Sequence, residues 1–210
     1  IWYNLSDTYE ATMTMEGFTQ GNQSVWQSGT GFVGWYDYNF RTPWKFNVSA
    51  AYTFGQNVAV DAEYEYADYS SAKFSDHDGY ELDYSNQLIK EDLKGVHTFR
   101  AGVEARLLDD ISLRAGYNYT GALYDEAAYK YDMPGSTATD VDFMNNYEAH
   151  NLSLGLGLSF GGFYADVAYV YTHQKADFHP YSNMIFSEPD PIAKVTHANN
   201  RGILTLGYRF

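Results

Sequence analysis

The sequence of 210 residues predicts an all-β protein, specifically a transmembrane antiparallel β-barrel, from three observations. Apolar and polar residues alternate strictly over about ten positions in several segments, which is the pattern of strands with one apolar face. Tight turns and long polar segments join these strands in alternation, as they do in outer-membrane barrels. Tyrosine supplies 21 residues, and its amphipathic ring is typical of the boundary between membrane and water.

The alternation predicts seven strands. In one of them the odd positions from Phe99 to Leu107 are apolar, and arginine, glycine and glutamate lie between them. Turns at Asp109-Asp110 and Gly161-Gly162 join neighbouring strands into hairpins. The expected strands are 43–54, 58–70, 97–108, 111–121, 147–160, 163–175 and 200–210.

The long polar segments 72–95, 121–146 and 176–197 are expected to be extracellular loops between the seven strands of residues 42–210. The chain is expected to be a single, incomplete domain. Within the first loop, 84–95 has the pattern of a short helix that stops at Gly95. Residues 1–41 are expected to form a loop or a partial strand of the barrel. Because bacterial single-chain barrels have an even number of strands, either 29–40 is an eighth strand or the chain belongs to a larger barrel.

Composition excludes several classes of protein. The 13 basic and 27 acidic residues give a net charge of −14, which disfavours nucleic acid and anionic surfaces as partners. The absence of cysteine excludes disulfide scaffolds, cysteine zinc sites and thiol catalysis. No apolar run approaches the roughly 18–20 residues of a transmembrane helix. A soluble β-sandwich stays an alternative, although its loop lengths would not segregate so regularly.

Charged residues in the strands fall at the polar positions of the alternation. On a lipid-facing position near the bilayer centre, a charge would cost roughly 2–4 kcal/mol, so these side chains are expected to line the lumen. Their mixed signs favour a structural role, in which paired charges hold the barrel rigid, and make an ion pathway the less favoured alternative. The lumen-lining candidates are Lys45, Asp61, Glu63, Glu65, Arg100, Glu104, Arg106 and Arg114.

No motif indicates a metal site, a cofactor or an enzyme. The six histidines show no ligand spacing, and His173 and His179, which flank one expected loop, are the pair to test. Residues 76–81 resemble a calcium loop but lack its third acidic position and distal glutamate, which favours a bare acidic turn. Ser153 and Ser159 occupy lumen positions without a histidine or aspartate arranged beside them, and no Gly-x-Ser-x-Gly motif is present.

Three segments carry a resemblance to a known family. Residues 41–48 (RTPWKFNV), continuing through 50–55 (AAYTFG) and 61–70 (DAEYEYADYS), resemble the Thr-Pro hairpin of the FadL-type transporters of hydrophobic compounds. Residues 163–169 (FYADVAY) and 207–210 (GYRF) are similar to the last two strands of its Bacteroidetes branch, often labelled hemin receptor or aromatic-hydrocarbon transporter. The resemblance runs from about residue 41 to the end of the chain.

The resemblance implies a bacterial outer-membrane protein for passive uptake of small hydrophobic molecules. The family barrel has fourteen strands and an N-terminal hatch, so the seven strands would be its C-terminal half, and no gating residue has a counterpart here. The expected partners are outer-membrane lipid, the barrel-assembly machinery, a hydrophobic small molecule, and a partner protein or the missing N-terminal half. Expected ligand contacts in the last loop are Tyr181, Met184, Ile185 and Phe186, and the expected assembly signal is Tyr208 with Phe210.

Two other functions stay open at this point. A barrel that does not transport would act as a scaffold or shuttle in a surface or secretion complex, and its long acidic loops would contact the partner. A complete eight-stranded barrel would have a structural or adhesin role, because its interior is just filled by side chains.

Overall fold

The structure is a computed structural model that describes residues 2–11, 18–20, 23–25, 32–128, 142–181 and 191–209. The chain divides into two compact units. The smaller comprises Ile1–Thr42 with Ala72–Asn86, and the larger comprises Pro43–Ser71 with Gln87–Phe210. Strands dominate both units, and the described residues include no helix that is long and apolar enough to cross a membrane.

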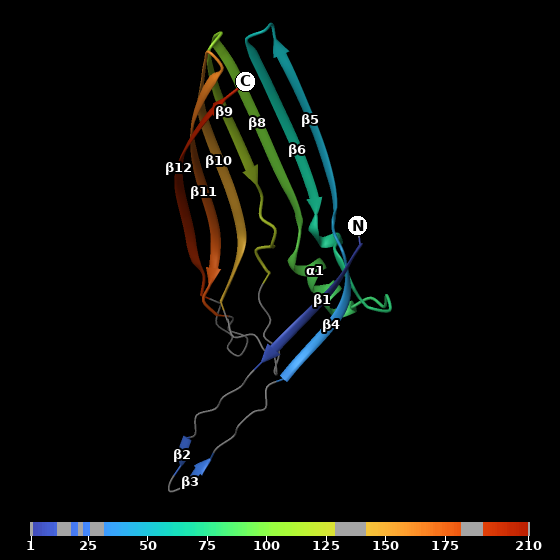
Figure 1. The fold of residues 1–210 in the computed structure, drawn as a ribbon. Helices are drawn as coiled ribbons and strands as arrows, with labels where there is room; N and C mark the ends of the chain where they lie inside the picture. Colours follow the sequence, from blue (N-terminus) through green and yellow to red (C-terminus); the bar gives the residue numbers. More distant parts are fainter. Residues whose placement is uncertain are drawn as a thin grey trace. The chain divides into compact units, whose positions relative to one another are not determined.

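The larger unit is a seven-stranded antiparallel sheet in the order β12-β11-β10-β9-β8-β6-β5 (Figure 1). Each strand lies beside its neighbours in the chain, so the sheet is a simple meander. All seven expected strands are present, and the sheet confirms the all-β antiparallel prediction. They are β5 (Trp44–Phe54), β6 (Val58–Asp68), β8 (Gly95–Leu108), β9 (Ile111–Thr120), β10 (Phe143–Phe160), β11 (Phe163–His179) and β12 (Ala193–Tyr208).

Three tight turns lie at one end of this sheet, which we call the turn end, and the longer connections lie at the loop end. Gly161 and Gly162 both have positive φ, of 54° and 86°, which suits the tight β10–β11 hairpin. At the loop end, β10 begins at Phe143, β11 continues to His179 and β12 begins at Ala193. The expected loops 121–146 and 176–197 are therefore too long, because polar residues continue the strands at both edges of each loop.

The smaller unit corrects the expectation that residues 1–41 form a loop or a partial barrel strand. It holds a sheet of β1 (Trp2–Ala11), β4 (Phe32–Arg41) and β7 (Lys73–Asp76) in the order β1-β4-β7, and a hairpin of β2 (Phe18–Gln20) and β3 (Gln23–Val25). β4 covers most of the expected eighth strand, yet within the described residues it pairs with β1 and β7 rather than with the larger sheet.

Thr42 and Pro43 separate β4 from β5, and the boundary between the two units falls between them. Proline has no N–H to donate to a strand ladder, so a break at this position is expected. The prediction of a strand start or local break at this Thr-Pro pair is confirmed.

The expected loop 72–95 contains regular structure, namely β7 and the helix α1 (Asp83–Asp92). The short 3₁₀ turn η1 (Tyr69–Ser71) precedes β7. Asn86 on α1 bonds both backbone groups of Phe74 on β7, with 2.7 Å from Phe74 N to Asn86 Oδ1 and 2.9 Å from Asn86 Nδ2 to Phe74 O. The helix ends three residues before the expected stop, and Gly95 opens β8 instead. The Tyr66 ring covers Gly95, where a Cβ would overlap it.

Burial of apolar residues is limited to small side chains in the described part of the chain. In the described part of the chain, the buried apolar residues are Ala67, Ala72, Val96, Ala128, Ala149 and Ala176. Phenylalanine, leucine, tyrosine and tryptophan side chains stay partly or largely exposed. A sheet this size in a water-soluble domain buries one face against a second layer, and the described residues provide no such layer.

Candidate functional site

The seven-stranded sheet has one apolar face, on which the alternating apolar residues of all strands come together. The register aligns Leu113, Leu156, Val167 and Leu204 as successive cross-strand partners on β9, β10, β11 and β12. These side chains are exposed, from 37% for Leu156 to 64% for Leu204. The face is therefore a continuous apolar surface that the described residues leave uncovered.

Aromatic side chains form two bands on this face, one at the turn end and one farther toward the loop end. β10, β11 and β12 continue beyond the second band. The turn-end band includes an edge-on contact of Tyr52 with Phe54, at 4.7 Å between centroids, and a contact of Phe163 with Tyr208 at the same separation. The members of the turn-end band are Tyr52, Phe54, Phe160, Phe163 and Tyr208. The members of the loop-end band are Trp44, Phe46, Tyr64, Tyr66, His97, Phe99, Tyr117, Tyr119, His150, Tyr169, Tyr171 and His173.

Aliphatic and small residues fill the apolar face between the two bands. At about 3.3 Å per residue, Phe163 and Tyr171 lie about 26 Å apart along β11, and Trp44 and Phe54 about 33 Å apart along β5. With a strand tilt of about 40°, these spacings, which include the aromatic bands themselves, correspond to an apolar height of about 20–25 Å, compared with the roughly 25 Å band of outer-membrane barrels. No charged residue occupies an apolar-face position between the bands in the described strands.

The opposite, polar face carries two clusters of ion pairs. The first joins β5, β6 and β8: Lys45 Nζ lies 2.9 Å from Glu65 Oε1, and Arg100 bonds to both Glu63 and Glu65. Asn47 Nδ2 donates to Glu63 Oε1 at 2.9 Å and so adds a neutral partner to the same cluster.

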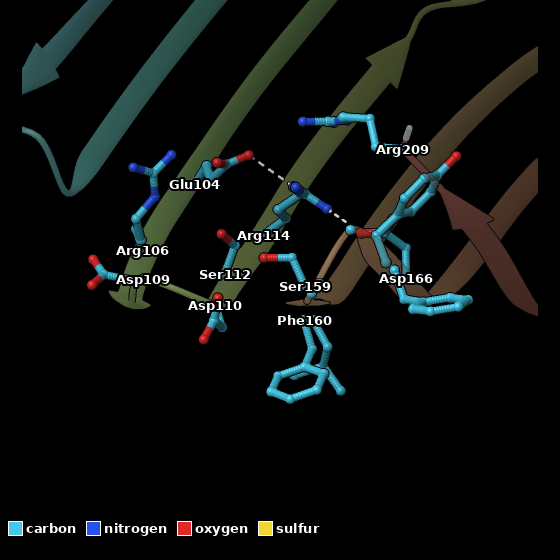
Figure 2. Close-up of a pocket in the computed structure, with 16 residues that line it drawn as sticks. Glu104, Arg106, Asp109, Asp110, Ser112, Arg114, Ser159, Phe160, Asp166 and Arg209 are labelled. Atoms are coloured by element: carbon cyan, nitrogen blue, oxygen red, sulfur yellow. Dashed lines mark hydrogen bonds and ion pairs between the residues drawn. The ribbon is translucent and has the colours of Figure 1, made fainter.

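The second cluster centres on Arg114 of β9 (Figure 2). Its Nε donates to Glu104 Oε2 on β8 at 2.8 Å, and its Nη1 donates to Asp166 Oδ1 on β11 at 2.7 Å. To reach β11 the guanidinium crosses β10, where Gly157 leaves the space open. A Cβ at Gly157 would lie 2.8 Å from Asp166 Oδ1 and 3.1 Å from Arg114 Nη1. The glycine is therefore part of the ion-pair geometry.

The register places all eight predicted lumen-lining residues on this polar face. Six of them take part in ion pairs, and Asp61 and Arg106 have none among the described residues. The sequence prediction omitted Asp166, although its polar position on the strand 163–175 was the available signal. Basic and acidic side chains on this face therefore form ion pairs, as predicted from their mixed signs.

A cavity of about 600 Å³ opens on the polar face at the turn end. Its lining combines the Arg114 cluster with the side chains of Arg106, Asp109 and Asp110 and with Arg209 beyond β12 (Figure 2). Nearby, the Tyr164 ring lies over Gly207, where a Cβ would overlap it. An aromatic ring that covers a glycine in the neighbouring strand shields the backbone there from water.

The structure does not bring the histidines His173 and His179 together. Both lie on β11, six residues and about 20 Å apart along the strand. His179 is buried, stacks on Phe143 and contacts Asn145 Oδ1 through Nε2 at 3.1 Å. Among the described residues, no group of three or more histidine, aspartate or glutamate side chains could hold a metal ion.

Residues 76–81 form a tight turn, with Gly79 at φ 93° and the Asp76 carboxylate accepting a bond from Tyr80 N at 2.8 Å. The Glu81 carboxylate pairs with Lys73 Nζ on β7 at 2.6 Å, and the Asp76 carboxylate is held by the turn itself, so this segment is an acidic turn.

The remaining residues named from the sequence are the two lumen serines, the expected ligand contacts of the last loop and the expected assembly signal. Ser153 Oγ donates to the backbone of Gly116 at 3.3 Å, and Ser159 lines the turn-end cavity. Tyr181 is exposed, and Tyr208 belongs to the turn-end band. Met184, Ile185, Phe186 and Phe210 lie outside the described residues.

Comparison with known proteins adds no relative: no protein-family model, no curated protein and no solved structure matches the chain.

Proposed function

We propose that this chain is the membrane-spanning wall of an outer-membrane β-barrel that admits small hydrophobic molecules passively. The observation that carries the membrane part is the apolar face, with its uncharged centre bounded by two aromatic bands. Water would make this arrangement costly at roughly 25 cal/mol per Å² of exposed apolar surface, and acyl chains would remove that cost. The polar face, with its paired charges, would then face the lumen.

Strand direction determines what completes such a barrel. The edge strands β5 and β12 are six antiparallel steps apart, so they run in the same direction. Antiparallel closure therefore requires an odd number of further strands between them. A second copy in the same orientation would place β12 parallel to β5, and an inverted copy would put its long loops on the side of the short turns. Further strands of another sequence segment fit better, and they would also protect the two long edges from non-specific pairing.

The transport part of the proposal rests on the resemblance to FadL-type proteins. In this proposal, ligands enter at the loop end, where exposed aromatic residues such as Tyr181 offer apolar contact within polar connections. The described residues contain no nucleotide-binding or redox motif, and uptake would follow the concentration gradient.

Reconstitution of the complete barrel, this chain together with the strands that close it, into liposomes tests the two parts separately. Flotation with the vesicles and protection of the strands from protease would measure insertion. Entry of a fluorescent fatty acid or another hydrophobic dye, compared with empty vesicles, would measure transport. Insertion without uptake would overturn transport and favour the scaffold role, in which case a stoichiometric protein should co-purify. Failure to insert would overturn both parts.

A further inference from the structure

Three histidines occupy positions on the apolar face, in the loop-end band. His150 and His173 are direct cross-strand partners, with ring centroids 6.4 Å apart. His97 is two residues along β8 from Phe99, and the cross-strand row that starts at Phe99 continues through Tyr119 to His150. We call His97, His150 and His173 the histidine row. It lies where the apolar face gives way to charged residues.

Tyrosines orient two of these imidazoles. Tyr64 Oη lies 2.8 Å from His97 Nδ1, and Tyr117 Oη lies 2.8 Å from His150 Nδ1. When each phenol donates to Nδ1, the ring proton of the neutral imidazole is on Nε2. In that tautomer, each ring presents its N–H donor on the nitrogen away from the tyrosine. His97 Nε2 has no hydrogen-bond partner among the described residues.

The charges around the row are nearly balanced. Glu148 Oε1 lies 3.9 Å from His150 Nε2 and 3.7 Å from Lys175 Nζ, so the lysine offsets the only carboxylate that contacts the row within the described residues. The other groups that face it are phenols, aromatic rings and neutral side chains from β6, β8, β9, β11 and β12. They are Tyr64, Tyr66, Phe99, Tyr117, Tyr119, Tyr171, Ala198 and Asn200.

The net charge of −14 disfavours anionic partners for the chain as a whole, so an anion site here depends on local donors. We propose that the histidine row is such a site and binds the phosphate groups of anionic membrane lipids. The inference rests on the proposed function, because it needs the apolar face to meet lipid. Acyl chains would then cover the aliphatic centre of the face, and the headgroup phosphates of the same lipids would lie at the height of the loop-end band. Neutral imidazoles offer Nε2–H donors to phosphate oxygens, and protonated imidazoles add positive charge. Because a protonated imidazole carries positive charge, we expect binding to be stronger at lower pH.

Lipid retention measured by native mass spectrometry tests this proposal. The purified protein in detergent is mixed with phosphatidylglycerol or phosphatidylcholine at about pH 8 and at about pH 5.5. We expect preferential retention of phosphatidylglycerol. Its affinity should increase at the lower pH by up to about fivefold per protonated histidine, as expected for a basic side chain near an anionic surface.

Replacing all three residues (His97→Gln, His150→Gln, His173→Gln) should remove both the preference and its pH dependence. His77→Gln, in the exposed turn of the smaller unit, is the matched control and should leave both unchanged. Tyr64→Phe with Tyr117→Phe retains the imidazoles but releases their orientation, and it should weaken retention at the higher pH most. Equal retention of the two lipids, or the same pH response in the triple variant, would overturn the proposal.

Inorganic phosphate separates a lipid site from a general anion site. It should compete weakly, because the acyl chains supply much of the lipid's binding energy; competition at the same concentration as the lipid would contradict a lipid site. Vesicle flotation of the same variants keeps the two proposals distinct. If the protein inserts and shows no lipid preference, the proposal that the histidine row binds lipid phosphate is wrong, and the proposed membrane location is unaffected.

Discussion

A charge placed at the centre of the apolar face should be far more harmful than the same charge one residue away. Leu204 and Thr205 are neighbours on β12 and point to opposite faces of the sheet. Leu204 is exposed and pairs with Val167, whereas Thr205 pairs with Asp166 on the polar face. Leu204→Arg and Thr205→Arg therefore introduce the same side chain into lipid and lumen respectively.

The position of Leu204 gives the expected magnitude. It lies four residues from Tyr208, in the turn-end band, and four from Asn200, the cross-strand partner of Tyr171 in the loop-end band. At about 3.3 Å per residue it is about 13 Å along the strand from each, close to the bilayer centre. Arginine there should cost about 2–4 kcal/mol, or between about 30-fold and about 1000-fold in the folding equilibrium. Arginine at position 205 should cost less than about 0.5 kcal/mol, with Asp166 beside it.

Urea unfolding of the protein in lipid vesicles, followed by tryptophan fluorescence, measures both free energies. The wild type and Thr205→Arg should have the same unfolding midpoint, and Leu204→Arg should unfold at lower urea or fail to insert. An equal effect of the two substitutions would refute the reasoning. If both were within about 0.5 kcal/mol of the wild type, the apolar face would behave as an ordinary water-exposed surface.

Three further changes test the packing of the sheet and its helix. Arg114→Met removes both ion pairs of the second cluster. Because these side chains are partly exposed, it should lower the free energy of unfolding by about 0.5–2 kcal/mol in the same urea assay. An unchanged free energy would show that the cluster does not stabilise the sheet. Gly207→Ala forces a methyl group against the ring of Tyr164. It should lower the free energy of unfolding by about 1–3 kcal/mol in the urea assay, and the second change Tyr164→Ala should restore part of that loss. If the losses of the two single variants simply add in the double variant, the ring contact is contradicted. Burial, with a smaller effect of Glu91, raises the pKa of the Asp92 carboxyl at the end of α1. The contribution of Asp92 to stability is therefore full below the ordinary aspartate pKa of about 3.9 and is lost as the pH rises through the folded pKa. Asp92→Asn should flatten the dependence of α1 stability on pH in this range, measured by amide hydrogen exchange, and an unchanged slope would contradict this prediction.

Local alternation was sufficient to predict the larger sheet. Strand 111–120 needs only its own residues to show which side chains share a face, because the strand period is two. The same property put Arg100 and Arg114 on the polar face without knowledge of their partners. Strand ends were predicted less well: β10 and β11 extend into segments where polar side chains on both faces hide the alternation.

Contacts that depend on register could not be predicted. The bond from Arg114 to Asp166 spans an intervening strand and needs Gly157 at the crossing point, which no local pattern in either segment reveals. The pairing of β4 with β7 joins residues more than 30 positions apart through a break at Pro43. The spacing of the histidines in the sequence gives no sign of a cluster, because His150 and His173 become neighbours only through the register of β10 with β11.

Spin-label accessibility along β10 tests the central assignment, that the apolar face meets lipid, most directly. Single labels would replace successive residues from Leu152 to Phe160 in the vesicle-reconstituted protein, and collision with oxygen would be compared with collision with a water-soluble nickel complex. We predict an alternation of period two, with labels at Leu154, Leu156 and Leu158 accessible to oxygen and protected from nickel, and with the greatest depth near Leu156. Equal nickel accessibility at even and odd positions would contradict the assignment.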